Sequence, residues 1–215
     1  MRPVVIVVEG GEGSGKTTAL AGIKEYLETC GLSVMPTREP GGVKIAEEIR
    51  EIILHVDHVQ MTKETEALLY AAARNQHLNE KVLPALADGK SILFDRFVMS
   101  SYVYQGIARG IDMTSLKAIN QFATCGFIPD ITLLLDVSPS VGFERVRSGR
   151  IDGVNRLDLE GMDFHVKVRN GHLAVAKDDP TVKVINANKD QATVLQSCIK
   201  EIDAFMRQRE LYEAN

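Results

Sequence analysis

A glycine-rich stretch near the start of the chain, GGEGSGKTT at 10–18, carries the residue types best suited to binding phosphate. Gly10, Gly15, Lys16 and Thr17 have the spacing of a phosphate-binding loop, whose glycines let backbone N–H groups turn toward phosphate oxygens. Lys16 can then reach the terminal phosphates of ATP, and the hydroxyl of Thr17 can bind Mg²⁺. The stretch predicts an ATP-binding protein but leaves the fate of the γ-phosphate open, because motors, switches and kinases share this loop.

One residue of the loop, Glu12, does not suit a site for anionic phosphates. It precedes the glycine and serine that lie closest to the phosphates, so its carboxylate can point away from ATP. We therefore expect Glu12 to face the second substrate, which accepts the phosphoryl group.

A second set of candidates lies where the apolar run SILF (91–94) ends. Asp95 and Arg96 then fall at the carboxyl edge of a parallel sheet, where open α/β sheets bind ligands. Asp95 could bind Mg²⁺ through water, and the planar guanidinium of Arg96 suits a phosphate. Alternatively, these two side chains neutralise each other. Further arginines that could converge on a second anion are Arg38, Arg50 and Arg74.

The polar, glycine-punctuated segment at 148–161 has the composition of a mobile loop. Four arginines lie in it or beside it: Arg145, Arg147, Arg150 and Arg156. Local positive charge on such a loop suits a lid that closes over transferring phosphates, although a charged helix face would give the same composition.

The elements that must position these residues alternate between buried strands and helices. Apolar runs predict five strands, at 4–8, 33–37, 91–94, 131–135 and 182–186. Helical patterns cover 16–30, 45–54, 62–88, 139–147, 162–177 and the terminal segment that starts near residue 190. Pro84 should kink or break the longest of these helices. The alternation predicts a single α/β domain over 1–215, a five-stranded parallel sheet with helices on both faces.

Composition excludes several classes of function. The chain carries 25 Lys and Arg against 29 Asp and Glu, a net charge of −4, which argues against a nucleic acid or an anionic membrane as partner. The start MRPVVIVVEGG holds too few apolar residues for a signal peptide or a membrane span, so we expect a cytoplasmic protein. Cys30, Cys125 and Cys198 are far apart and predict neither a metal nor a redox site. The five histidines form no paired motif, and we expect surface or core roles for them.

Eight motifs follow one another along the chain: VEGGEGSGKTT (8–18), TREPGG (37–42), EEIR (47–50), YAAAR (70–74), DRFVMSSYVYQG (95–106), PDITLLLDV (129–137), NRLDLE (155–160) and INAN (185–188). In this order they make the chain resemble thymidylate kinase of the bacterial type. The resemblance implies the P-loop nucleoside monophosphate kinase fold, with an arginine-bearing lid near 148–161. It also implies phosphoryl transfer from ATP to dTMP with Mg²⁺, and a homodimer formed through helices around 43–88.

The resemblance also implies roles for most of the candidate residues. ATP would contact Gly10, Gly11, Glu12, Gly13, Ser14, Gly15, Lys16, Thr17, Thr18, Arg147, Asn186 and Ala187. The nucleotide dTMP would contact Glu12, Arg38, Glu39, Pro40, Arg50, Tyr70, Arg74, Arg96, Ser101, Tyr104 and Gln105. Within that set, Glu12 would accept a hydrogen bond from the 3′-hydroxyl, Tyr70 would stack on thymine and Arg74 would face its O4 edge. The catalytic cations would be Lys16, Arg96, Arg150 and Arg156, although the variable spacing of the lid leaves the choice between Arg147 and Arg150 open. Mg²⁺ would be held by Thr17 and Asp95.

Ala73 departs from the family pattern. It stands where bacterial relatives often carry a serine before the base-reading arginine, and loss of a hydroxyl could relax the selection of thymine. The alternatives to dTMP phosphorylation are a monophosphate kinase of broader or different base preference, a deoxynucleoside kinase, and a P-loop switch without kinase activity. Arg38 and Arg96 favour an acceptor that already carries phosphate, which argues against the deoxynucleoside kinase.

Overall fold

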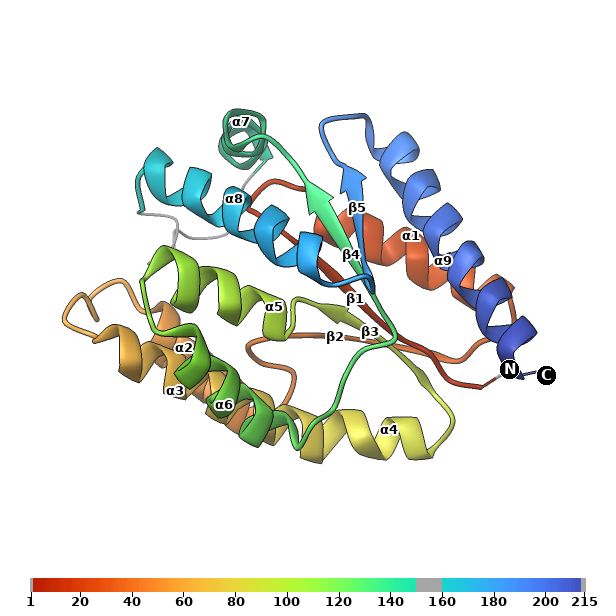
Figure 1. The fold of residues 1–215 in the computed structure, drawn as a ribbon, viewed down its shortest axis with the longest axis horizontal. Coiled ribbons are helices and arrows are strands. Elements are labelled where there is room, and N and C mark those ends of the chain that lie inside the picture. The colour runs from red at the N-terminus through yellow and green to blue at the C-terminus, as the bar shows by residue number, and fades with distance from the viewer. Residues whose placement is uncertain (1, 150–159, 214–215) are drawn as a thin grey trace.

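Strand β1 lies at the centre of a five-stranded parallel sheet in the computed structural model, which describes residues 2–149 and 160–213 (Figure 1). The strands pair in the order β2-β3-β1-β4-β5. Val7 of β1 lies opposite Phe94 of β3 and Thr132 of β4, and both pairings are parallel. The strand bounds are β1 (Val5–Gly10), β2 (Val34–Arg38), β3 (Ser91–Asp95), β4 (Ile131–Asp136) and β5 (Val182–Asn186). The predicted fold class and its five strands are therefore confirmed.

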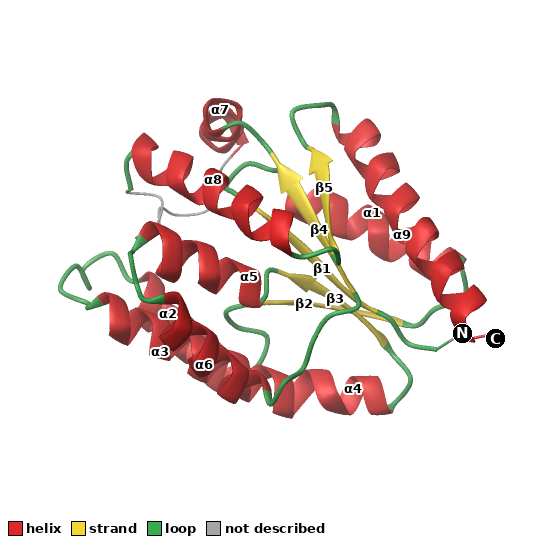
Figure 2. Cartoon of the chain, in the orientation of Figure 1, coloured by secondary structure: helices red, strands yellow, loops and turns green. Residues whose placement is uncertain are grey.

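Helices cover both faces of the sheet (Figure 2). Their bounds are α1 (Lys16–Thr29), α2 (Lys44–Leu54), α3 (Lys63–His77), α4 (Leu83–Ala87), α5 (Val98–Ser101), α6 (Met113–Thr124), α7 (Pro139–Gly149), α8 (Met162–Asp178) and α9 (Gln191–Glu213), with π-helical turns η1 (Leu78–Val82) and η2 (Tyr102–Ala108). The sequence pattern assigned no element to 98–124, where α5, η2 and α6 lie. The π-helical turn η2 departs from the 3.6-residue period, whereas α6 is a regular α-helix that was missed.

Side chains alternate along β1 and enter two separate cores. Val4, Ile6 and Val8 pack in a core shared with α1 and α9. Val5 and Val7 pack on the opposite face, against η1 and α4. Because both faces of β1 are covered, the strand must be apolar at consecutive positions, which explains the continuous apolar run in the sequence.

The long helix predicted over 62–88 begins as expected and changes form before Pro84. The hydroxyl of Thr62 caps α3 by accepting a hydrogen bond from the N–H of Thr65 at 3.2 Å. At 78–82 the helix widens into the π-helical turn η1, which runs directly into α4. A proline ring crowds the carbonyl four residues earlier, so a widened turn lets the chain continue instead of breaking.

The carboxyl ends of four strands bring the predicted chemistry to one edge of the sheet. The glycine-rich loop follows β1, Arg38 ends β2, Asp95 ends β3 and Asp136 ends β4. Strand order alone thus places the two halves of the candidate site side by side. Among the described residues, no helix combines the length and the apolar character needed to cross a membrane.

Candidate functional site

Glycines shape the loop between β1 and α1. Gly13 and Gly15 have positive φ angles of 68° and 87°, which residues with a side chain rarely adopt. A Cβ on Gly13 would collide with the backbone of Gly142, because α7 packs directly on the loop. Gly15 precedes α1 and has no side chain to cap it, so the first N–H groups of the helix can bind an anion.

Lys16 folds back over this loop. Its Nζ donates to the carbonyl oxygens of Gly10 at 3.1 Å and Gly11 at 3.0 Å. Burial, together with the positive charge of Arg96, holds the pKa of Lys16 below its usual value, although nearby carboxylates oppose the shift. An ammonium group shielded from water in this way interacts strongly with any phosphate that enters the loop.

A cavity of about 750 Å³ joins the loop to the ends of β2 and β3. Residues predicted to contact ATP and residues predicted to contact dTMP both contribute to the lining of this cavity. The lining includes Glu12, Gly13, Ser14, Gly15, Lys16, Thr17, Thr18, Arg38, Glu39, Arg50, Asp95, Arg96, Arg145, Lys189, Asp190 and Gln191. The structure therefore brings the phosphate loop into one space with the charged residues at the sheet edge, Arg38, Glu39, Asp95 and Arg96.

Asp95 lines this cavity at the end of β3. Its Oδ1 is buried and makes no hydrogen bond among the residues described. The guanidinium of Arg96 pairs with Glu12, at 2.9 Å, and not with its chain neighbour Asp95. A buried carboxylate oxygen without a donor is costly, and a hard cation or its bound water would satisfy it. Because the exposed Thr17 lines the same cavity, the donor set fits the predicted Mg²⁺ site.

A second, smaller pocket adjoins the cavity and is bordered by α2, α3, α5 and η2. Every residue predicted to contact dTMP lies in its lining except Arg38. The lining comprises Glu12, Glu39, Pro40, Arg50, Tyr70, Arg74, Arg96, Ser101, Tyr104 and Gln105, together with Leu54, Phe97 and Ser100. Arg38 lines the larger cavity, and its Nη2 lies 2.8 Å from Oε2 of Glu47.

Four residues line both spaces, namely Glu12, Glu39, Arg50 and Arg96, and among them Glu12 and Arg96 form an ion pair. Arg96 has a positive φ of 67°, and its Nη1 lies 3.3 Å from the hydroxyl of Tyr104. Burial works against the charged guanidinium, but the negative charges of Glu12, Asp95 and Glu9 raise the pKa of Arg96 above its usual value. Burial also raises the pKa of Tyr104 to about 12, so its hydroxyl keeps its proton. The carboxylate of Glu12 lies 2.9 Å from Nη2 of Arg96, at the boundary between the cavity and the smaller pocket.

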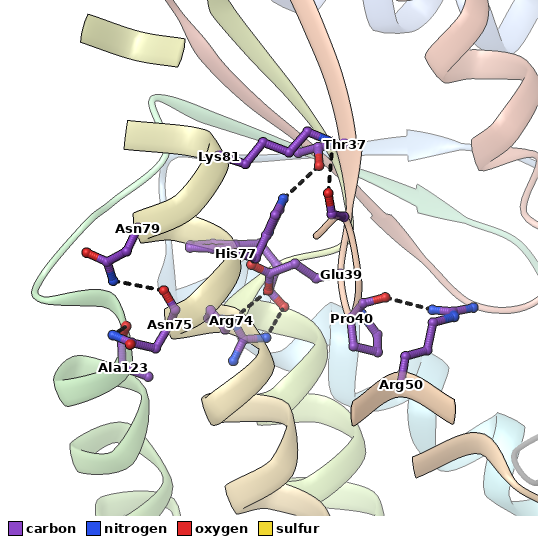
Figure 3. Close-up of polar contacts among 12 residues, drawn as sticks. Thr37, Glu39, Pro40, Arg50, Arg74, Asn75, His77, Asn79, Lys81 and Ala123 are labelled. Atoms are coloured by element: carbon purple, nitrogen blue, oxygen red, sulfur yellow. Dashed lines mark hydrogen bonds and ion pairs between the residues drawn. The ribbon is translucent and has the colours of Figure 1, made fainter. Parts of the chain in front are cut away.

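Arg74 is held by a buried network between α3 and the loop after β2 (Figure 3). Its Nε donates to Oε2 of Glu39 at 2.7 Å, and Nδ1 of His77 lies 3.2 Å from the other carboxylate oxygen. The other ring nitrogen of His77, Nε2, lies 2.7 Å from the hydroxyl of Thr37. Because Arg74 also donates to Ser101 at 3.2 Å, its guanidinium is fixed in one orientation at the pocket wall.

The role of Glu9 was missed by the sequence analysis. This residue of β1 is fully buried, and its Oε1 accepts hydrogen bonds from the N–H groups of Phe97 at 2.8 Å and Ser100 at 3.1 Å. These N–H groups open α5, so the carboxylate stabilises the start of a helix that borders the pocket. Burial alone would raise the pKa of Glu9, but His172, Arg96 and Ser100 together lower it below its usual value. A lone acid inside the run VVIVVEG was the signal available in the sequence.

Asn186 and Ala187 were predicted to lie behind the adenine ring, but the cavity is lined by the residues that follow them, Lys189, Asp190 and Gln191. Ala187 is buried and its N–H donates to the carbonyl of Asp136 at 2.8 Å, whereas Asn186 ends β5. Arg145 donates to the carbonyls of Ala187 at 2.9 Å and Gly13 at 3.4 Å, which connects this segment to the phosphate loop. The cavity residues missed here are Lys189, Asp190 and Gln191.

The predicted lid is described only in part. Arg147 lies exposed in the last turn of α7. Arg150 and Arg156 belong to 150–159 and lie outside the described residues, as does most of the predicted lid at 148–161.

Known proteins resemble this chain over nearly its whole length. A family model described as thymidylate kinase matches residues 8–198. Thymidylate kinase of Halalkalibacterium halodurans is 52% identical over 198 residues, covering 92% of this chain and 94% of that protein. The thymidylate kinase of Shouchella clausii is 48% identical over 202 residues, with 94% and 95% covered. That of Clostridium novyi is 47% identical over 203 residues, with 94% and 97% covered.

Proposed function

This chain belongs to the thymidylate kinase family and is an ATP-dependent kinase that phosphorylates dTMP, and we propose that its two adjoining spaces bind the two substrates. The cavity at the glycine-rich loop takes ATP, and the smaller pocket takes dTMP. The observation that carries this division is the position of Glu12 and Arg96, which line both spaces where they meet. Phosphoryl transfer needs two anions held in line and their charge neutralised, and it needs no protein nucleophile.

Two cations do the electrostatic work at the junction. Lys16 leaves the loop carbonyls and binds the terminal phosphates of ATP, and Arg96 binds the phosphate of dTMP and the charge that develops during transfer. This role of Arg96 is supported by its ion pair with Glu12 and its hydrogen bond to the hydroxyl of Tyr104, which keep the guanidinium charged and oriented in a partly buried site. Arg38 joins it at the dTMP phosphate by exchanging its ion pair with Glu47 for the incoming anion.

The base and sugar of dTMP are recognised by the buried wall of the smaller pocket. Arg74 donates to the O4 edge of thymine, and Tyr70 stacks on the ring. Glu12 accepts a hydrogen bond from the 3′-hydroxyl, and Tyr104 excludes a 2′-hydroxyl by occupying the space beside the sugar. The fixed orientation of Arg74 supports this assignment, because a preorganised donor binds one base edge without first being ordered.

Thr17 and Asp95 would hold Mg²⁺, which would help to neutralise the charge of the ATP phosphates when bound. The buried Oδ1 of Asp95 without a donor supports this site. Asp95→Asn should weaken Mg²⁺ binding, measured by calorimetry with the ATP-bound protein. Unchanged Mg²⁺ affinity would remove Asp95 from the site.

We further propose a homodimer and a cytoplasmic location, as the resemblance and the sequence predict. Apolar side chains are exposed on the helices concerned, with Ile45 and Ile52 of α2 and Leu68 of α3 each close to half exposed. Analytical ultracentrifugation of the protein tests the dimer, and a monomer at micromolar concentration would contradict it.

An ADP-release assay over a panel of acceptors tests the substrate assignment. We expect dTMP to be the best acceptor, ahead of dUMP, dGMP and thymidine. Thymidine lacks the phosphate that Arg38 and Arg96 bind, so turnover of thymidine above dTMP would favour a deoxynucleoside kinase. Equal ADP release without any acceptor would refute a kinase in favour of a switch or hydrolase. The ratio of dTMP to dUMP turnover measures the effect of Ala73.

A further inference from the structure

Arg109 lies outside the pocket lining but contacts two segments that border it. It follows η2, and its side chain is 22% exposed. Its Nη1 lies 2.6 Å from Oε1 of Glu160, and its guanidinium carbon lies 4.9 Å from the ring centroid of Phe164. Both partners flank the start of α8. On its other side, Nε of Arg109 lies 3.7 Å from Oε1 of Glu66 in α3.

A route from Arg109 to the smaller pocket passes through Glu66. The side chain of Glu66 is 2% exposed, and its Oε1 accepts a hydrogen bond from Nε2 of Gln105 at 2.8 Å. Gln105 is itself buried and lines the pocket. Arg109 and Gln105 therefore share one carboxylate oxygen, so a shift of the guanidinium changes the acceptor that orients the Gln105 amide.

A second route passes through aromatic rings. Phe164 of α8 packs against Tyr104, with ring centroids 6.1 Å apart. Tyr104 also lies 3.3 Å from Nη1 of Arg96, through its hydroxyl. Because the Arg109 guanidinium lies over the ring of Phe164, it stabilises this ring, which in turn packs against Tyr104 of the pocket wall.

We propose that Arg109 is a positioning residue that couples the start of α8 to the dTMP pocket. The guanidinium of Arg109 makes two contacts. Its ion pair with Glu160 fixes the start of α8, and its contact with Glu66 fixes the acceptor of the Gln105 amide. This inference rests on the proposed assignment of Tyr104 and Gln105 to the dTMP pocket.

Steady-state kinetics of Arg109→Gln, Glu160→Gln and the double variant test the coupling. We expect Arg109→Gln to raise KM for dTMP by about 10-fold, because loss of about 1.4 kcal/mol of pocket organisation corresponds to that factor. KM for ATP should stay within about 2-fold, since Arg109 does not touch the phosphate loop. Glu160→Gln should raise KM for dTMP by about 3-fold, and the double variant should be no worse than Arg109→Gln alone, because both remove one link.

Lys24→Gln is the matched control. Lys24 pairs with Glu28 at 2.6 Å on α1, away from both spaces, so its loss should leave both KM values within about 2-fold of wild type.

Three results would overturn the inference. One is a folded Arg109→Gln variant with wild-type KM for dTMP, folding being checked by thermal unfolding. Another is purely additive effects of the two substitutions, which would show that Arg109 acts without α8. If Arg109→Gln fails to fold, Glu160→Gln alone decides, and an unchanged KM for dTMP then refutes the coupling.

Gln105→Leu separates this inference from the proposed function. An unchanged KM for dTMP in Gln105→Leu would refute the assignment of the pocket and the inference with it. A raised KM in Gln105→Leu with no change in Arg109→Gln would refute the Arg109 inference alone.

Discussion

Glu39→Gln removes one negative charge from the buried network around Arg74 and keeps the shape of the side chain. The Glu39 and Arg74 side chains are 3% and 2% exposed, and Nε lies 2.7 Å from Oε2. The other acceptors of Arg74 are neutral, namely the hydroxyl of Ser101, the carbonyl of Phe97 and the amide oxygen of Asn120. The substitution therefore leaves a buried guanidinium beside neutral groups only, among the contacts described.

Neutralising one partner of a buried ion pair costs about 3–5 kcal/mol of unfolding free energy. For a chain of this size, 1 kcal/mol shifts Tm by about 2–4 °C, so we expect Tm to fall by roughly 6–20 °C. KM for dTMP should rise as well, because Glu39 fixes the orientation of Arg74 at the pocket wall.

Urea and thermal unfolding followed by circular dichroism measure this loss, and Glu28→Gln provides the matched control. Glu28 pairs with Lys24 at 2.6 Å, but the two side chains are 45% and 37% exposed. Solvent screens such a pair, and its loss should cost less than about 1 kcal/mol. If Glu39→Gln lost no more stability than Glu28→Gln, the buried ion pair would not be what holds Arg74 in place.

Three further substitutions test the site. Arg96→Ala should lower kcat by about 10²–10³-fold while ATP binding, measured by calorimetry, survives, because Arg96 stabilises charge at the junction of the two spaces; turnover near wild type would remove Arg96 from the site. Glu12→Ala should raise KM for dTMP by about 10-fold and leave KM for ATP within about 2-fold, as loss of one hydrogen bond to a charged group predicts; a larger effect on ATP would contradict the orientation of Glu12. For Glu9, hydrogen bonding and the nearby positive charge lower the pKa below its ordinary value of 4.5 despite burial. The contribution of Glu9 to the unfolding free energy is therefore present above pH 4.5 and is lost as the pH falls through the pKa of Glu9 in the folded protein. Glu9→Gln should therefore be less stable at neutral pH and lose less stability on acidification in urea unfolding, and a parallel acid limb in both proteins would show that Glu9 is not the group responsible.

Local spacing determined the parts of the site that lie close together in the chain. The phosphate loop is encoded within nine residues, because its geometry depends on glycines at set positions between a strand and a helix. The inner strands β1, β3 and β4 were also predictable, since a strand covered on both faces must be apolar at consecutive positions. The edge strands β2 and β5 are only partly buried. Asp95 and Arg96 followed from the same reasoning, because the end of a parallel strand fixes which edge of the sheet they occupy.

The family motifs also predicted residues of the dTMP pocket, but the sequence pattern did not show which helices form the wall of that pocket. No element was assigned to 98–124. The turn η2 departs from the helical period, and the regular helix α6 was missed as well. Leu54 lines the pocket from outside the quoted motifs, and Phe97 and Ser100 line it from within DRFVMSSYVYQG although no role was predicted for them.

Only the tertiary structure decided which partners the charged and polar groups inside the protein find. Glu9 meets Ser100 across 91 positions of sequence, Arg74 meets Glu39 across 35, and His77 meets Thr37 across 40. The sequence shows that such residues exist, and a charge inside an apolar strand indicates that it needs a partner. Which partner it finds depends on how helices pack on the sheet, and a carboxylate removed from water is stabilised only by the donor that this packing brings within hydrogen-bond distance.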